Sequence, residues 1–350
     1  MRWFLLFAVA VIFLPLSSAI EIGEVRVEDG KIMGKYLPAG LEGKISCYSG
    51  GKHILDMIYN NDSIEISLKY FGREIERILE RNPFLKEEIE KSLMAINVRG
   101  ASYEIEYAGC KVELHDVPTR FLRIIADEIV FSNLNYTIEK VDEHTIKLKK
   151  ENFTAMILCK GKLAINGNAI YTTHEIMLIS FAYQEEENIE DAIKNKVLGG
   201  EITIVSHDVK NGTDCISYFG NVSITPAKLE RGKVVLKVDG DEKAGGKIIK
   251  INLGKNVCLS DEFKIKFDGR FVQEASGIED ILNPDDDGIE PEYYLLATKQ
   301  EGVILLVSIP HFSEHILSIE FIVENIITKT LAFLSALLVI AIAAIYMFKK

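Results

Sequence analysis

Short runs of alternating apolar and polar residues fill most of the chain and predict β-strands. The period of two that a half-buried strand requires is clearest at residues 63–68, 103–107 and 145–149. Further runs of this kind lie at 24–27, 111–114, 153–158, 162–165, 175–181, 201–206, 214–218 and 222–225. Strands about ten residues apart, without a strand–helix–strand unit, predict an antiparallel sandwich or a stacked β-roll.

Two segments follow the helical period instead. Residues 73–97 carry an apolar stripe on both sides of Asn82, which predicts two helices joined at this residue, with Asn82 capping the second. Residues 185–198 begin with an acidic turn, as the helix dipole prefers, and the glycine pair at 199–200 is expected to stop them. We expect the stripe of residues 73–97 to pack on the neighbouring sheet, and a partner surface is the alternative. The acidic residues of 185–198 argue against a position on a membrane surface, because helices that lie there carry basic polar faces.

A second β domain is predicted over residues 226–325. Pro226 and the polar residues after it indicate a boundary. Strands are expected beyond it at 233–238, 247–253, 263–267, 293–298, 303–309 and 316–322. About seven strands in a hundred residues are typical of an immunoglobulin-like sandwich. The predicted fold class is therefore mainly β, with a β-rich extracellular domain at 20–225 that carries the two helical insertions, followed by this sandwich.

Both ends of the chain predict membrane targeting. Residues 331–348 contain no charge and would span roughly 27 Å as a helix, so we expect a transmembrane helix within 326–348. The two lysines at 349–350 predict a cytoplasmic tail. Residues 1–19 have the charged, apolar and small-residue regions of a signal peptide; an uncleaved anchor is the alternative. The expected protein is a single-pass protein of the cell membrane, with its N-terminus outside.

The composition narrows the choice of partners and of source. A net charge of −12 argues against nucleic acid, because binding to phosphate needs a basic surface. Glutamate, lysine and isoleucine are abundant while glutamine occurs three times, which is typical of a protein from an archaeal or thermophilic source. Five sequons predict a glycoprotein, beginning at Asn61, Asn135, Asn152, Asn211 and Asn221.

The five cysteines lie in the predicted extracellular part, where disulfides persist. At most two bridges can form within one chain. The remaining thiol is then either buried or paired with another chain. No Cys-x-x-Cys pair is present, which argues against a zinc ribbon or a thioredoxin-like site.

An acidic run near residue 285 is the strongest candidate for a cation site. Seven carboxylates stand within fourteen residues: Glu279, Asp280, Asp285, Asp286, Asp287, Glu290 and Glu292. The spacing of Asn283, Asp285 and Asp287 before Gly288 is that of a calcium loop, and Glu290 could add a further ligand. The twelfth position is Tyr294 instead of glutamate. Calcium is thus the one cofactor predicted, and a solvated acidic turn is the alternative.

The histidines suggest weaker candidates. His311 and His315 have a spacing that would suit zinc on a helix, but Pro310 favours a strand and turn, where we expect the two residues about 13 Å apart. His115-Asp116 and His207-Asp208 each look like half of a charge-relay arrangement. Neighbouring residues on a strand, however, point to opposite faces. No nucleophile elbow or phosphate-binding loop is present, so no catalytic residue is predicted. Carboxylate pairs of the glycosidase kind stay open, since they meet only in the fold.

Three stretches resemble the membrane-proximal β domain of archaeal cell-surface proteins, a largely uncharacterised family. They are Lys-Ile-Lys-Phe-Asp-Gly at 264–269, the acidic run at 277–288, and Leu-Val-Ser-Ile-Pro-His-Phe-Ser-Glu-His at 306–315. The resemblance covers about residues 233–322. It implies an exported protein associated with the envelope and implies no known chemistry.

Together these patterns predict a surface protein with a structural, adhesive or partner-binding role. Its expected partners are the lipid bilayer, through residues 331–348, and envelope or S-layer proteins or glycans. An anchored hydrolase that acts on envelope polymers is the first alternative, and an accessory subunit of a membrane complex is the second. Binding is favoured over catalysis.

Overall fold

The computed structural model describes residues 26–28, 31–33, 42–60, 63–85, 97–99, 102–115, 120–150, 153–181, 187–209, 212–218, 222–241, 243, 245–258, 260, 262–286, 288–299 and 302–322. The predicted signal peptide, membrane helix and tail lie outside these residues, as do Asp287 and every sequon asparagine except Asn135. Among the described residues strands predominate and helices are few, so the mainly β class is confirmed. No helix in the described ranges is long and apolar enough to cross a membrane.

The N-terminal half forms a large β unit built on one 14-stranded sheet. Its strands are β1 (Arg26–Glu28), β2 (Lys31–Met33), β3 (Glu42–Ser49), β4 (Lys52–Asn60), β5 (Ser63–Leu68), β6 (Asn97–Arg99), β7 (Ser102–Tyr107), β8 (Cys110–His115), β9 (Arg120–Ser132), β10 (Thr137–Lys140), β11 (Thr145–Lys150), β12 (Phe153–Cys159), β13 (Leu163–Asn166) and β14 (Ala169–Phe181). Every pairing among them is antiparallel.

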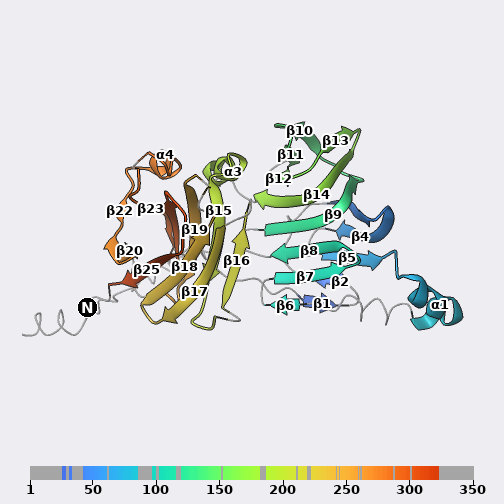
Figure 1. The fold of residues 1–350 in the computed structure, drawn as a ribbon, viewed down its shortest axis with the longest axis horizontal. Helices are drawn as coiled ribbons and strands as arrows, with labels where there is room; N and C mark the ends of the chain where they lie inside the picture. Colours follow the sequence, from blue (N-terminus) through green and yellow to red (C-terminus); the bar gives the residue numbers. More distant parts are fainter. Residues whose placement is uncertain are drawn as a thin grey trace, which may run out of the picture.

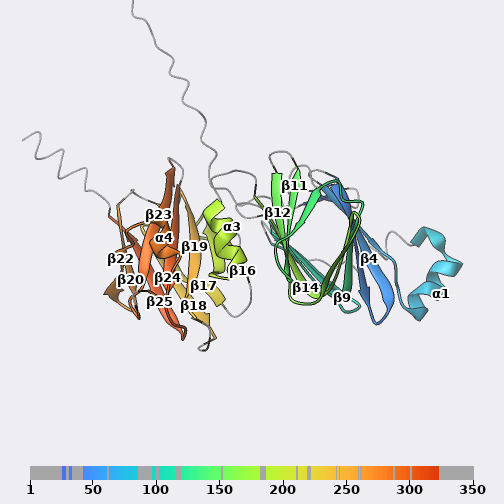
Figure 2. The same cartoon turned by 90° about the horizontal axis from the view of Figure 1, so that it is seen from above.

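The sheet forks at the long strand β9. One edge of β9 pairs with β14, whereas the other edge pairs with β8 near Phe121 and with β3 near Phe131. At the fork, the Asp127 carboxylate accepts the Gly50 N–H from the tip of the β3–β4 hairpin at 2.6 Å. The two branches curve round a single core that includes residues of β3, β4, β5, β7, β8, β9, β12 and β14 (Figure 2).

The C-terminal half is a β-sandwich. One sheet has six strands in the order β16 (Thr213–Ser217), β15 (Leu198–Ile204), β19 (Lys247–Gly254), β24 (Gly302–Ile309), β23 (Glu292–Lys299) and β22 (Gln273–Glu274). The other has five in the order β17 (Val222–Glu230), β18 (Lys233–Gly240), β25 (His315–Phe321), β20 (Phe263–Phe267) and β21 (Arg270–Phe271). Apolar residues from both sheets share one core between them. The β15–β19 pair is parallel.

The predicted domain boundary between residues 225 and 226 lies inside β17. Pro226 marks a bulge in that strand, where the register with β18 shifts, and the strand continues to Glu230. Proline is tolerated there because β17 is an edge strand. Strands β15 and β16, which we placed before the boundary, pair into the six-stranded sheet of the sandwich.

The first of the two predicted helices is confirmed. The helix α1 covers Arg73–Arg81, as its apolar pattern indicated, and Asn82 follows it and donates its backbone N–H to the Ile78 carbonyl. A single 3-10 turn, η1 (Pro83–Leu85), follows, and the rest of the predicted stripe lies outside the described residues. Helix α1 lies at the end of the molecule far from β25 (Figure 1).

The second predicted helix, α3 (Glu187–Lys194), ends four residues before the expected position. Lys196 takes φ of 60°, and its N–H and that of Val197 bond back to Ile193 and Ala192, which closes the helix in a Schellman motif. The glycine pair that we expected to stop the helix lies within β15. A Cβ at Gly199 would lie 2.7 Å from a methyl carbon of Val222, so close packing accounts for glycine there.

Helix α3 lies at the junction of the two β units. Its residues Ile189 and Ile193 pack in a third core with Met177 of β14 on one side and with Ile248 of β19 on the other. A short helix, α4 (Ile278–Ile281), contributes Ile281 to the same core. The outer face of the β9–β14–β12 region therefore packs, through α3, against the outer face of the six-stranded sheet (Figures 1 and 2).

Candidate functional site at the junction of the two β units

A buried histidine links the two β units. His115 ends β8, and its position after Leu114, which points into the large core, turns its side chain towards the sandwich. Its Nδ1 lies 2.9 Å from an oxygen of Asp214 on β16, and its Nε2 lies 2.8 Å from Glu113 Oε1. Both ring nitrogens therefore meet carboxylates, one of them from the other unit.

The contacts continue along the large sheet. Arg123 of β9 binds Glu113 at 3.1 Å through Nη1 and Glu175 of β14 at 3.2 Å through Nε. Its Nη2 donates to the backbone carbonyl of Ser217 on β16, which is a second polar contact between the units. We call His115, Glu113, Asp214, Arg123 and Glu175 the junction network.

The junction network holds His115 and Glu113 in their charged forms. Burial alone would lower the pKa of His115, but the charge and hydrogen bond of Asp214, then those of Glu113, outweigh it and raise the pKa to about 9. For Glu113, burial opposes ionisation, yet the hydrogen bond and charge of His115 and the Arg123 guanidinium lower the pKa to about 2. An imidazolium bound by carboxylates on both nitrogens cannot serve as a general base. The network holds the two units together.

A second buried polar cluster lies on the same face of the six-stranded sheet. Glu201 of β15 accepts hydrogen bonds from Tyr218 at 2.8 Å and from the Asn252 amide at 2.6 Å, and Lys250 lies 3.4 Å from it. The Tyr218 ring packs edge-on against Phe121 of the large unit, with centroids 5.9 Å apart. Buried charges need such hydrogen bonds to offset their desolvation, and the bond to Glu201 holds the Tyr218 ring against Phe121.

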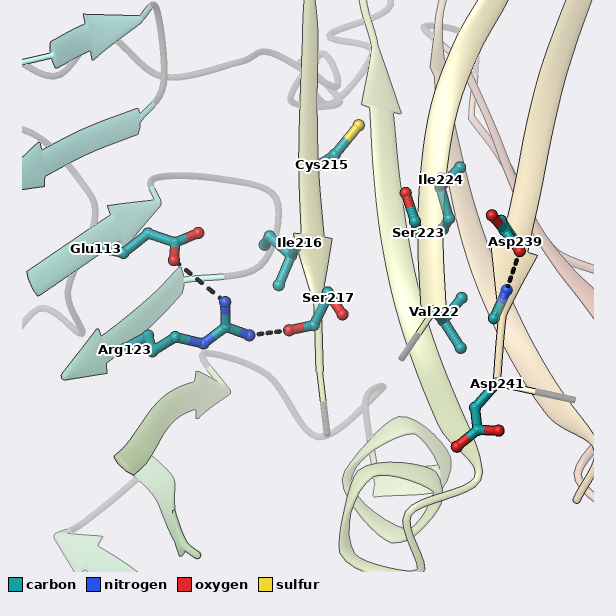
Figure 3. Close-up of a pocket in the computed structure, with 11 residues that line it drawn as sticks. Glu113, Arg123, Cys215, Ile216, Ser217, Val222, Ser223, Ile224, Asp239 and Asp241 are labelled. Carbon is teal, nitrogen blue, oxygen red and sulfur yellow. Dashed lines mark hydrogen bonds and ion pairs between the residues drawn. The ribbon is translucent and has the colours of Figure 1, made fainter. Parts of the chain in front are cut away.

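An open groove of about 680 Å³ borders the junction network (Figure 3). It runs between β16 and β17, the edge strands of the two sandwich sheets. Its apolar lining comes from four residues of these strands: Cys215, Ile216, Val222 and Ile224. Glu113 and Arg123 lie on one side in Figure 3, and Asp239 and Asp241 of the β18 end lie on the other.

The predicted calcium ligands have different surroundings in the structure. Asp285 accepts the Gly246 N–H at 2.9 Å, and the Asn283 amide donates to Asp286 at 3.0 Å, so these side chains serve the loop itself. Glu290 is exposed, and Asp287 lies outside the described residues.

A different set of acidic side chains converges nearby. One oxygen from each of Asp280, Asp286 and Glu292 lies within 4.8 Å of the others. Asp280 also accepts hydrogen bonds from the backbone N–H and the hydroxyl of Ser276, which lower its pKa. Calcium at this loop stays a prediction, and these three carboxylates are the ones that could share a cation.

The candidate histidine pairs take other partners. His311 and His315 lie with ring centroids 5.2 Å apart, closer than an extended strand allows, because the chain bends between Pro310 and Glu314. The two nitrogens of His315 contact Asp268 at 2.7 Å and Ser313 at 3.0 Å, which occupies both possible metal-binding atoms.

The cysteines are free thiols. All five lie in the described part of the chain and none is bonded to another, so the structure lacks the expected disulfides. Cys159, for example, contacts the Thr172 hydroxyl and accepts the Gly161 N–H. Of the sequon residues described, Asn135 is exposed in the turn between β9 and β10, where a glycan could be attached.

Sequence reasoning missed most of the junction network. It noted His115 only with its neighbour Asp116, and it assigned no role to Glu113, Arg123 or Asp214. The charged residues on the outer faces of β8 and β9 were a signal that these faces carry polar contacts, but their partners come from distant segments.

A scan against family models and a search of curated proteins found no match to this chain.

Proposed function

We propose that the chain is a single-span, membrane-anchored protein of the cell envelope with a structural, adhesive or partner-binding role. The predicted anchor supports this, because β25 ends at Phe321 and the uncharged stretch begins at Leu331, ten residues later. The sandwich, for which we predicted an immunoglobulin-like form, would then stand next to the membrane and the large β unit beyond it. The exposed Asn135 sequon and the resemblance to archaeal surface proteins agree with this location.

The junction network is the observation that favours a binding role over a catalytic one. Both ring nitrogens of His115 contact carboxylates, and Arg123 contacts two carboxylates and a carbonyl, so these groups serve to join the units. Two β units locked in one body give a rigid support that presents surfaces at a distance from the bilayer. The groove beside the network is the surface best suited to a partner, and it favours partner binding over a purely structural role.

Membrane fractionation tests this proposal. The full chain and a chain that ends after residue 325 would be expressed with the same N-terminal segment. We expect the full chain to resist extraction with sodium carbonate and the shorter chain to be released in soluble form, with the same unfolding midpoint for the soluble part. Recovery of both chains in the soluble fraction of the cytoplasm would refute the proposal.

A further inference from the structure

We propose that the groove between β16 and β17 binds an extended, lysine- or arginine-bearing segment of a partner protein, which adds a strand to β16. This inference names the partner of the binding role proposed above and rests on it. Three features of the groove support it: an open strand edge, an acidic rim and an apolar lining.

The first feature is the edge of β16. Within the described chain, β16 is the last strand of its sheet and pairs with β15 alone. Tyr218 donates its N–H inwards to Gly199, whereas the Ser217 carbonyl points outwards to Arg123. Because backbone groups alternate along an antiparallel strand, the N–H and carbonyl of Cys215 share the outward direction of Ser217. An extended peptide binds such an edge through its main chain.

The Arg123 contact shows how this edge accepts a cation. Its guanidinium comes from the large unit and donates to the Ser217 carbonyl at the end of the groove. The two carboxylates that pair with Arg123 are those of Glu113 and Glu175, which belong to the same unit; Glu113 also binds His115, and Glu175 also pairs with Lys160. The outer edge of β16 therefore already accepts a hydrogen bond from a charged side chain outside its sheet. The rest of the strand extends from that contact along the groove.

The rim and lining determine the chemistry of the partner. Asp239 and Asp241 face the groove from the β18 end, and together with Glu113 they outnumber Arg123 among its charged lining residues, so the lining has an excess of negative charge. A lysine or arginine side chain suits it, because the aliphatic stem can cover Val222 and Ile224 while the charged end reaches the carboxylates. β16 has five residues, so the added strand would cover about 16 Å.

Peptide binding to the full chain in detergent micelles tests the inference. The probe is a fluorescein-labelled peptide, Thr-Lys-Val-Lys-Val-Thr, followed by fluorescence anisotropy. One control peptide carries glutamate in place of lysine, and another carries N-methyl groups on alternate residues, which remove the main-chain donors. The test variant is Asp239→Asn/Asp241→Asn. Its matched control is Glu128→Gln/Glu143→Gln, which removes two exposed charges from the large unit.

We expect saturable binding of the lysine peptide that weakens at least tenfold in the Asp239→Asn/Asp241→Asn variant and at least tenfold for each control peptide. The Glu128→Gln/Glu143→Gln variant should bind as the unmodified chain does, and circular dichroism should show all variants folded. No saturable binding, or equal binding by the aspartate variant, would overturn the inference. Full retention by the N-methylated peptide would overturn strand addition. The fractionation result is independent, so a chain that is anchored but binds no peptide would refute only this inference.

Discussion

Replacing Asp214 by asparagine should weaken the junction between the two β units and change how stability depends on pH. The Asp214 carboxylate is the main reason that the pKa of the buried His115 imidazole rises from 6.5 to about 9. Because the pKa of His115 rises from 6.5 to about 9 on folding, protonated His115 stabilises the native state by about 3 kcal/mol. Breaking a buried ion pair by removing one partner costs a similar amount, about 3 to 5 kcal/mol.

The pH window follows from the direction of the shift. A group whose pKa is raised on folding stabilises the native state fully below its unfolded pKa, here near 6.5, and this stabilisation is lost as the pH rises through about 9. We therefore expect the unmodified chain to lose about 3 kcal/mol between pH 6.5 and pH 9.5 through this histidine. The Asp214→Asn variant should already be less stable at pH 6.5 and should lose much less on going to pH 9.5.

Urea unfolding at several pH values measures this effect. Trp3 is the only tryptophan and lies in the predicted signal peptide, so near-ultraviolet circular dichroism of the tyrosines is the suitable probe. The exposed His207→Gln variant is the matched control and should follow the unmodified chain. If Asp214→Asn and the unmodified chain show the same stability and the same slope between pH 6.5 and 9.5, the assigned role of His115 is wrong.

Three further predictions address other parts of the molecule. The pKa of Glu113 is lowered on folding, so its stabilisation is present above about pH 4.5 and is lost as the pH falls towards 2; Glu113→Gln should flatten this acid limb in the same urea assay. Ile193→Ala should cost about 2 to 5 kcal/mol, because it opens a cavity in the junction core, whereas an equal stability would contradict the packing of α3. Calcium at ten times its dissociation constant should raise the unfolding midpoint by about 2 to 4 °C. Asp280→Asn/Asp286→Asn should abolish that rise, and coincident curves with calcium and with chelator would show a solvated loop.

Most strands were predictable because one of their faces is polar. Residues 145–149 alternate clearly, and the structure has β11 there. The central strand β9 was not predicted, for two physical reasons. Its outer face carries Phe121, which is buried at the junction, so apolar residues occur on both faces. The register with β14 also shifts between Thr172 and His174, which breaks the alternation of β9 near Asp127.

The candidate site was even less predictable from the sequence than the strands were, because its residues come together only in the fold. His115 and Asp214 lie 99 residues apart in sequence, and no local pattern relates them. Their contact exists because β8 and β16 belong to different units whose outer faces meet across α3. The groove likewise needs two edge strands from two sheets, and strand order is a tertiary property.

The sequence by itself determined the mainly β character, the position of α1 and the presence of a helix at α3, because periodicity and charge pattern are local properties of the chain. It also carries the prediction of a membrane anchor. Tertiary structure alone decided that the sheet forks at β9, that β15 and β16 join the sandwich, and that the charged residues of two units form one buried network. These features depend on pairing between segments that lie far apart in the sequence. A buried charge can stabilise the fold only when its distant partner has been brought within hydrogen-bonding distance.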